Sequence, residues 1–160
     1  MTDTILFKEV QRFTQWYIWI LLLGLLCIPV YGIIQQLVFN KPFGDNPMSD
    51  LGLVIFFFGM LAFCFLFRMM QLKTTVTKEK ITIQFIPFLS KKISREEVAH
   101  AEIVKYGFVG YGIRFSTTHG TVYNMKGNKG IALTLANKKK FLIGTQKPHE
   151  LDDVIQSVIK

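Results

Sequence analysis

The chain has 160 residues, half of them hydrophobic, and a formal net charge of +8 at pH 7. Two uncharged apolar runs, residues 16–39 and 51–67, argue against a purely soluble protein. The two cysteines, Cys27 and Cys64, both fall inside these runs, so the rest of the sequence has no cysteine for a disulfide or a zinc site.

The two apolar runs are long enough to cross a bilayer. A spanning helix needs about 20 apolar residues at roughly 1.5 Å each. The first run meets this length, and the second reaches it if Arg68 extends its charged end to the interface. A signal peptide is the alternative for the first run, but its apolar core has only about 7–15 residues and precedes a small-residue cleavage site. We therefore predict a transmembrane hairpin with spans at about 16–39 and 51–70.

Charge around the predicted spans indicates their orientation. The connecting loop, residues 40–50, carries one Lys and two Asp, whereas Lys8 and Arg12 precede the first span and Arg68 and Lys73 border the second. Positively charged flanks stay on the cytoplasmic side. We therefore expect a multi-pass membrane protein with both termini in the cytoplasm.

The remaining residues alternate between apolar and polar side chains. In "KITIQF", for example, Ile81, Ile83 and Phe85 share one face. Short runs of this period, separated by turn residues, predict about seven antiparallel strands. The last segment, "PHELDDVIQSVIK", instead has the spacing of an amphipathic helix whose stripe is Leu151, Val154, Ile155 and Val158. The predicted domains are an N-terminal segment with the spans, residues 1–70, and a cytoplasmic domain, residues 71–160.

Several stretches resemble one family. These are "YGFVGYGIRF", "GTVYNMKGNKG" and "KKFLIGTQKPHEL", with "QRFTQWYIWI" and "PFGDNP" earlier in the chain. They are similar to an uncharacterised family of bacterial two-span membrane proteins with a C-terminal pleckstrin-homology-like (PH-like) domain. The resemblance implies an α+β membrane protein: a two-helix transmembrane hairpin, then an antiparallel seven-stranded PH-like barrel closed by a C-terminal helix. It also implies the bacterial cytoplasmic (inner) membrane, and no particular activity.

Two residues depart from the family's pattern. Tyr111 stands where Trp is usual, and Lys138 where the hairpin usually has Gly. A tight hairpin turn favours Gly, so the geometry of the turn at Asn137 and Lys138 is left open.

The stretch "GNKG", residues 127–130, superficially resembles a phosphate loop. That loop has four residues between its glycines, then Lys and Ser or Thr, and opens a helix. Here the spacing differs, and the apolar alternation that follows predicts a strand. Gly127 and Gly130 are interpreted as turn residues that supply positive φ. Gly144 and Thr145 precede the last helix, where a backbone anion site remains an alternative.

No catalytic motif is recognisable. His100, His119 and His149 are scattered without metal-ligand spacing, and no Ser or Cys lies in a nucleophile motif. We therefore expect a protein that is not an enzyme and needs no cofactor.

The basic residues of the soluble domain are its most informative feature. From Leu72 onward the chain has 15 Lys and Arg against 7 Asp and Glu. Near an anionic leaflet each basic residue contributes about 1 kcal/mol to binding. Such lysines also serve simply to keep strand edges soluble, and the sequence leaves both readings open. Nucleic acid is not expected as a partner, since no binding motif appears. The candidate anionic-lipid contacts are Lys91, Lys92, Arg95, Lys138, Lys139 and Lys140.

Two function hypotheses follow. The first is a membrane-anchored PH-like binding or scaffold module, with the lipid bilayer and anionic headgroups as its partners. The second is a structural subunit of a membrane assembly or a homo-oligomer, with another protein or another copy as partner.

Overall fold

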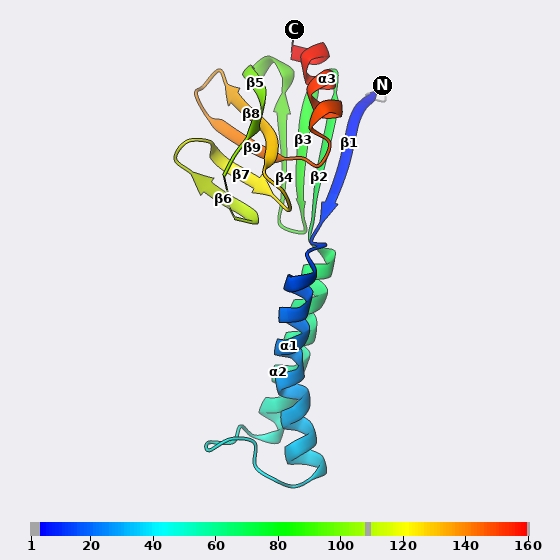
Figure 1. Ribbon diagram of the computed structural model, residues 1–160, viewed down its shortest axis with the longest axis vertical. Coiled ribbons are helices and arrows are strands. Elements are labelled where there is room, and N and C mark those ends of the chain that lie inside the picture. Colours follow the sequence, from blue (N-terminus) through cyan, green and yellow to red (C-terminus); the bar gives the residue numbers. More distant parts are fainter. Residues whose placement is uncertain (1–3, 108–109, 160) are drawn as a thin grey trace. The chain divides into compact units, whose positions relative to one another are not determined.

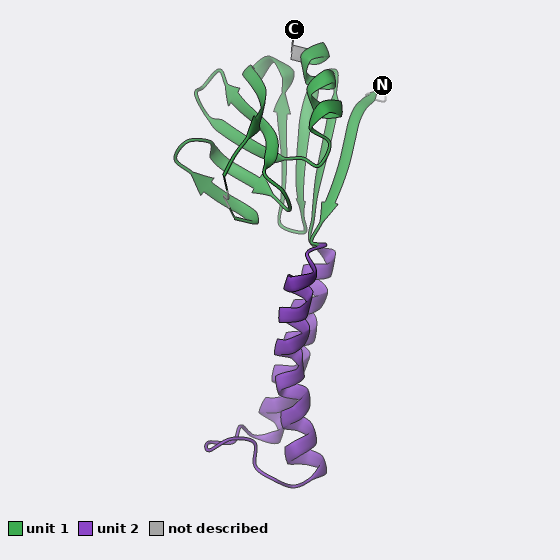
Figure 2. Ribbon diagram, in the orientation of Figure 1, with its two compact units in different colours: residues 1–13, 70–160 green, residues 14–69 purple. Residues whose placement is uncertain are grey.

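The computed structural model describes residues 4–107 and 110–159 and divides the chain into two compact units (Figure 2). One unit is residues 14–69 and contains the two apolar helices. The other combines the segment before residue 14 with the segment from Met70 onward. The N-terminal segment therefore groups with the soluble domain, whereas the sequence analysis had placed it with the spans.

The helical unit contains two helices long and apolar enough to cross a membrane. Helix α1 (Trp16–Ile33) continues through a π-helical turn, η1 (Ile34–Val38), and α2 is Asp50–Met69. In their most apolar windows only 17% and 6% of the residues are buried, so most apolar side chains face outward. Gly32 lets the helices approach closely, because a Cβ there would lie 3.1 Å from a methyl carbon of Leu53.

The first four strands form an antiparallel sheet in chain order (Figure 1). Strand β1 comes from the N-terminal segment, and the other three follow α2. The inward side chains Leu72, Ile83 and Phe85 are fully buried and make the core of this sheet. The strands are β1 (Ile5–Arg12), β2 (Gln71–Thr77), β3 (Lys80–Ile86) and β4 (Leu89–Ser94).

The remaining strands form a second sheet with the order β5-β8-β9-β7-β6. A 3₁₀ turn, η2 (Arg95–Glu97), leads from the first sheet into the second. Strands β7 and β9 are parallel neighbours, and the other pairs are antiparallel. The strands are β5 (Val98–Lys105), β6 (Gly112–Ser116), β7 (Gly120–Asn124), β8 (Lys129–Leu135) and β9 (Lys140–Gly144).

The predicted single barrel of seven antiparallel strands is therefore wrong. Within the described residues there are two sheets, of four and five strands. Two features account for the difference. The N-terminal segment adds β1 to the first sheet, and the β6–β7 hairpin is inserted between β5 and β8, which brings β7 alongside β9 in parallel. The broader prediction, an α+β protein with two apolar helices, is confirmed.

Helix α3 (Pro148–Ile159) packs against β5, β8 and β1. Leu151 and Ile155, predicted to form its apolar stripe, are 1% and 2% exposed. Pro148 is the first helical residue, where its missing N–H costs no hydrogen bond. The predicted C-terminal amphipathic helix is confirmed.

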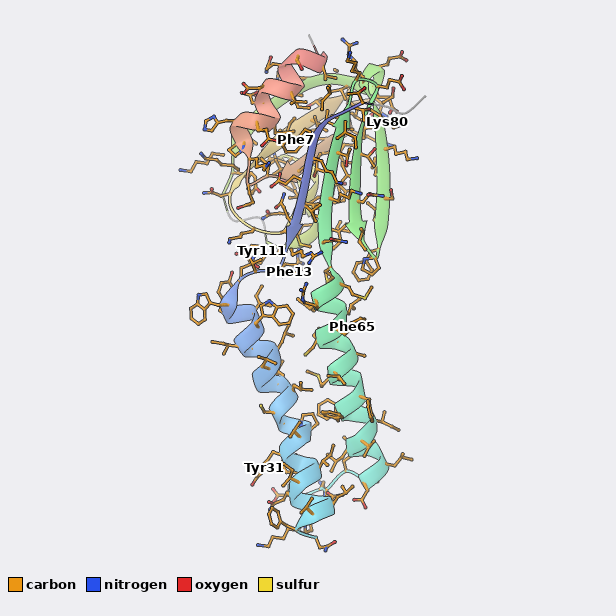
Figure 3. The ribbon with its side chains drawn as sticks, turned by 90° about the vertical axis from the view of Figure 1, so that its right-hand side faces the viewer. Phe7, Phe13, Tyr31, Phe65, Lys80 and Tyr111 are labelled. Carbon is orange, nitrogen blue, oxygen red and sulfur yellow. The ribbon has the colours of Figure 1, made fainter. Side chains whose placement is uncertain are left out.

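Strand β1 makes both polar and apolar contacts from its inward face. Glu9 accepts hydrogen bonds from the hydroxyl of Thr145 (2.5 Å) and the backbone N–H of Gln146 (2.8 Å). Gln11 donates its side-chain amide to the carbonyl of Gly144 at 2.7 Å. Phe7, on the same face, is 2% exposed (Figure 3). These contacts tie the edge of the first sheet to the connection between β9 and α3.

The two connections to the helices leave the domain from neighbouring strand ends. Arg12, the last residue of β1, pairs with Gln71, the first residue of β2, and Gln71 pairs with Ile86 at the end of β3. Strand β1 leads into α1, and Met70 alone separates α2 from β2. We call this end of the first sheet the tethered end. Phe13 lies there, with its ring edge-on to Tyr111 at 6.4 Å (Figure 3).

Candidate functional site

The best candidate site is a basic pocket of about 390 Å³ between two hairpin turns of the second sheet. One wall is the β6–β7 connection and the other is the β8–β9 connection. We call it the lysine pocket. Its lining includes Phe115, Gly120, Phe141 and the three consecutive lysines Lys138, Lys139 and Lys140. The structure therefore brings half of the predicted anionic-lipid contacts together in one concave site.

The β8–β9 turn holds Lys138 in a conformation that usually belongs to glycine. Its φ is +64°, in the left-handed region. The N–H of Lys138 donates to the carbonyl of Leu135 (2.9 Å), and the N–H of Leu135 donates to the carbonyl of Lys139 (2.8 Å). Asn137 accepts the N–H of Lys139 with its side chain at 3.1 Å. This is the geometry of a three-residue hairpin loop with a left-handed last residue, and it answers the question left open for this turn.

The opposite wall approaches β9 closely because of a glycine. Gly120 has a φ of +67°, and a Cβ there would overlap the backbone carbonyl of Lys140. This close approach lets β7 run parallel to β9, with Thr121 opposite Phe141. The Lys140 ammonium then donates to the carbonyl of Thr118 across the pocket at 3.4 Å. One of the three lysines is therefore oriented before any ligand binds.

The other predicted cluster is divided by the structure. The Lys91 ammonium lies 4.4 Å from the ring centre of Phe141, a cation–π contact behind the wall of the lysine pocket. Lys92 is exposed on β4, opposite Thr82. Arg95 lines a separate pocket of about 320 Å³ together with Lys78. None of these three residues lines the lysine pocket, although Lys91 contacts the ring of its lining residue Phe141.

Phe115 is the site residue that sequence reasoning missed. Alternation predicts β6 and places Ile113 and Phe115 on one face. In the structure these two residues are 39% and 81% exposed. Strand β6 is the edge strand of its sheet and pairs only with β7. Within the sequence, the pattern of an exposed edge strand is the same as that of a half-buried one, so no signal distinguished them.

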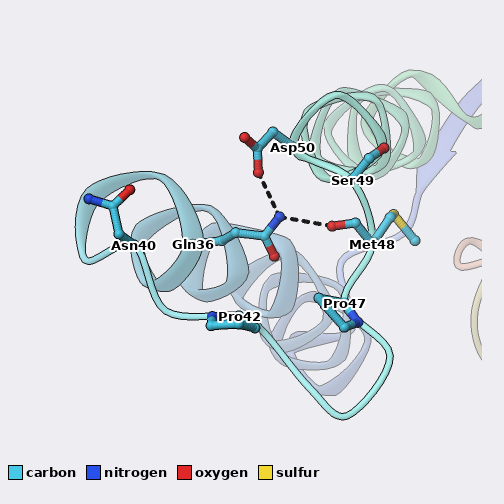
Figure 4. Close-up of a pocket in the computed structure, with 7 residues that line it drawn as sticks. All are labelled: Gln36, Asn40, Pro42, Pro47, Met48, Ser49 and Asp50. Atoms are coloured by element: carbon cyan, nitrogen blue, oxygen red, sulfur yellow. Dashed lines mark hydrogen bonds between the residues drawn. The ribbon is translucent and has the colours of Figure 1, made fainter.

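A second pocket, of about 520 Å³, lies in the helical unit at the loop between the helices (Figure 4). The Gln36 amide donates to Asp50 Oδ1 at 2.6 Å and to the carbonyl of Met48 at 2.8 Å. Asn40 and Ser49 also line this pocket. Gln36 thus ties the π-helical turn to the first residue of α2. The hydrogen bonds give this pocket a structural role in holding the loop.

Two buried tyrosines of the second sheet and its connections have raised pKa values. Burial raises the pKa of Tyr106 to about 12, and its hydroxyl donates to the carbonyl of Lys129 at 3.3 Å. Burial also raises the pKa of Tyr123. Both phenols therefore stay protonated at neutral pH. Among the residues that the structure describes, no three His, Cys, Asp or Glu side chains gather as metal ligands would.

The glycines that superficially resembled a phosphate loop have two different roles. Gly127 has a φ of +82°, as the prediction of a turn residue requires. Gly130 instead lies in β8, where a Cβ would come within 2.5 Å of the carbonyl oxygen of Ile143. It permits the close pairing of β8 with β9, so the prediction that it supplies positive φ is wrong.

Comparison with known proteins identifies a family. A family model described as "Family of unknown function (DUF6141)" matches residues 2–160. The chain belongs to this family. No curated protein compared with the chain matches it.

Replacing Lys138 by Gly tests the strained turn. A left-handed conformation costs a non-glycine residue about 1–2 kcal/mol, and glycine gives back part of this through its more flexible unfolded chain. We expect Lys138→Gly to raise the free energy of unfolding by up to about 1 kcal/mol. The matched control Lys139→Gly, whose residue is not among those with positive φ, should lower it instead. Thermal unfolding of the full chain in detergent measures both. Equal destabilisation by the two changes would contradict the turn geometry.

Proposed function

We propose that this member of the DUF6141 family is a membrane-anchored binding module, not an enzyme, whose soluble domain binds an anionic, phosphate-bearing group in the lysine pocket. The observation that carries the proposal is the convergence of Lys138, Lys139 and Lys140 on one concave surface beside the exposed ring of Phe115. Arg and Lys side chains are the usual protein groups for binding phosphate, and Lys acts there as a point charge.

The strand arrangement supports a PH-like assignment for the soluble domain. If the β6–β7 hairpin is set aside as an insertion, the first sheet and the antiparallel run β5-β8-β9 together supply seven strands. The C-terminal helix α3 then packs against strands of both sheets, β1 from one and β5 and β8 from the other. Seven strands in two sheets followed by a helix is the order expected of a PH-like domain. In this arrangement the two membrane spans are inserted between the first and second strands.

The apolar helices support a location in the bacterial cytoplasmic membrane. In the proposed arrangement the two helices cross the membrane as a hairpin, with residues 39–49 outside the cell and both termini in the cytoplasm. The charge asymmetry supports this orientation, because Lys8, Arg12 and Arg68 lie on the flanks proposed to be cytoplasmic. The soluble domain would then face the anionic cytoplasmic leaflet.

Reporter fusions test this orientation. A reporter that is active only outside the cytoplasm should be active when fused within the loop at Asp45 and inactive when fused after Lys160, because basic flanks retain the termini inside. A cytoplasm-specific reporter at the same two sites is the control and should give the opposite pattern. Activity of the first reporter at the C-terminus would reject the proposed topology.

The lysine pocket lies away from the tethered end of the domain. We therefore consider a soluble phosphate ester as the ligand as well as a phospholipid headgroup. Lys140 begins β9, whereas Gly144 ends it and is bound by Gln11, the neighbour of the tethered residue Arg12. The pocket therefore lies at the end of β9 away from the contact with β1. A phospholipid headgroup and a soluble phosphate ester present the same chemistry to the three lysines, and an experiment with two arms distinguishes them.

Neutralising the pocket should abolish this binding. Three lysines at about 1 kcal/mol each correspond to roughly a hundredfold in affinity. In the first arm, the full chain in phosphatidylglycerol nanodiscs should show slower hydrogen exchange at residues 136–141 than in phosphatidylcholine nanodiscs. In the second, glycerol phosphate is titrated into the phosphatidylcholine sample. The triple variant Lys138→Gln, Lys139→Gln, Lys140→Gln should lose the response in whichever arm shows it.

A matched pair of cations serves as control. Lys78→Gln with Arg95→Gln neutralises the separate pocket and should leave the response at residues 136–141 unchanged. The response should also weaken with salt, because the Debye length falls from about 10 Å at 0.1 M to about 3 Å at 1 M. No response of the unmodified chain in either arm would refute the proposed function.

One observation favours the alternative of a structural subunit or homo-oligomer. Edge strand β6 exposes Ile113 and Phe115 on one face, and exposed apolar edge strands pair readily with another chain. Arg114, on the same strand, is also exposed, but its guanidinium donates a hydrogen bond to the carbonyl of Tyr111 at 3.1 Å. This strand is therefore the surface that an assembly would use.

Photo-crosslinking separates this alternative from a lone binding module. A photoreactive residue in place of Ile113 should give a crosslink to a second copy or to another membrane protein in native membranes if β6 is an assembly edge. The same residue in place of exposed Gln156 on α3 is the control. Equal yields of protein adducts at the two positions would contradict an assembly role for β6.

A further inference from the structure

The turn between β3 and β4 exposes apolar side chains at one end of the first sheet. Phe88 is 58% exposed and Leu89 is 36% exposed, and Pro87 precedes them. We call these three residues the apolar turn. Three consecutive exposed apolar side chains form a contiguous patch, and contiguous exposed patches are the kind of surface that contacts a membrane or another protein.

The apolar turn is held in place by the sheet behind it. The N–H of Phe88 donates to the carbonyl of Phe85 at 2.7 Å. The rings of Phe88 and Phe85 lie 6.3 Å apart, and Phe85 itself is 1% exposed. Leu89 is paired with Phe85 in the β3–β4 ladder. The exposed Phe88 ring is therefore fixed on a buried one and projects without a large loss of conformational entropy on binding.

The ladder places the apolar turn at the tethered end of the domain. Ile86, the last residue of β3, pairs with Gln71, and Gln71 pairs with Arg12. The turn thus follows directly from the strand end that lies beside the two ends continuing into α1 and α2. The opposite end of β3, at Lys80, pairs with Ser94 and lies at the other end of the sheet (Figure 3).

We infer that the apolar turn inserts into the interfacial region of the bilayer that the two helices cross, and so fixes the orientation of the soluble domain. The inference rests on the proposed membrane anchoring. Its occupant is a lipid surface, because the turn shares the tethered end with both membrane connections. Aromatic side chains favour this region, where a ring meets headgroups and acyl chains together.

The charge around the turn fits the same occupant. Arg12 is exposed at the tethered end, and Lys73 lies near the start of β2, whose first residue pairs with Arg12. Basic residues beside an inserted apolar group attract the anionic cytoplasmic leaflet. An apolar tip with basic residues behind it is the pattern of a peripheral membrane contact.

Tryptophan fluorescence in a lipid bilayer tests the inference. The chain has two tryptophans, both in α1, so the background variant is Trp16→Phe with Trp19→Phe. On it, Phe88→Trp is compared with Phe115→Trp, which replaces the 81% exposed ring of β6. Each full-length variant is placed in phosphatidylcholine nanodiscs with and without lipids that carry bromine near the headgroup. Neutral lipid keeps the test independent of the lysine pocket.

The expected result is a clear difference between the two positions. Phe88→Trp should lose at least half of its emission when brominated lipid is present, whereas Phe115→Trp should change little. Leu89→Trp, at the next residue, gives a second reading if Phe88→Trp folds poorly. Equal quenching of Phe88→Trp and Phe115→Trp overturns the inference. So does the absence of quenching in both Phe88→Trp and Leu89→Trp when these variants are folded.

Alkaline carbonate extraction of the cell membranes in which the chain is expressed separates this outcome from failure of the proposed membrane anchoring. If the chain is released, the membrane anchoring itself is wrong and the inference falls with it. If the chain stays in the membrane but the turn is not quenched, the inference fails and the anchoring stands.

Discussion

The pairing of β1 with β2 is the constraint on which the rest of the structure depends. These two strands are neighbours in the sheet, yet the whole helical unit lies between them in the chain. An ordinary connection between paired antiparallel strands is a turn of a few residues. Because the register places Arg12 opposite Gln71, the chain must leave and re-enter the domain at the same end. The domain is therefore held at two adjacent points, which restricts its rotation more than one flexible tether would.

Polar contacts add to the ladder with β2 and to the burial of Phe7 in keeping β1 in this place. Glu9 is 6% exposed and its carboxylate accepts two hydrogen bonds from the connection between β9 and α3. Hydrogen bonds to a charged group are worth about 1.5–3 kcal/mol, and the loss of either partner would leave a buried carboxylate incompletely satisfied. The strand that enters α1 thus contacts the start of α3 directly.

The same feature explains what could be predicted from the sequence. Strands β2, β3 and β8 alternate with apolar residues inward, as at Ile81, Ile83 and Phe85, and α3 has its apolar stripe, so these elements were predicted well. Strand β1 reverses the pattern. Glu9 and Gln11 are buried, while Val10 is 46% exposed. A pattern of hydrophobicity cannot reveal a strand whose inward polar side chains make hydrogen bonds to residues about 135 positions away in the chain. The inserted β6–β7 hairpin was missed as an insertion because its parallel partner β9 comes later in the chain.

The candidate site was predictable in its charge but not in its shape. A run of three lysines is visible in the sequence. The concave shape of the pocket depends instead on the close packing of Gly120 against the backbone of Lys140 and on the left-handed turn at Lys138. Strain at a binding surface indicates that the surrounding structure enforces it. Here the ladder between β8 and β9 does so on both sides of the turn, with Leu135 bonded to Lys139. The result is that charges adjacent in sequence are directed into one space.

The two exposed aromatic residues differ in what supports them, and this difference argues for different roles. Phe88 is fixed on the buried Phe85 ring at the tethered end. Phe115 projects from an edge strand beside the lysines of the pocket. An edge strand with an exposed aromatic residue promotes uncontrolled pairing unless nearby charge opposes it, and lysines are the usual opposing residues. Lys138, Lys139 and Lys140 therefore restrict what can approach β6. Under the proposed function, the charge that would repel a second basic edge of the same kind is also the charge that would attract an anionic group.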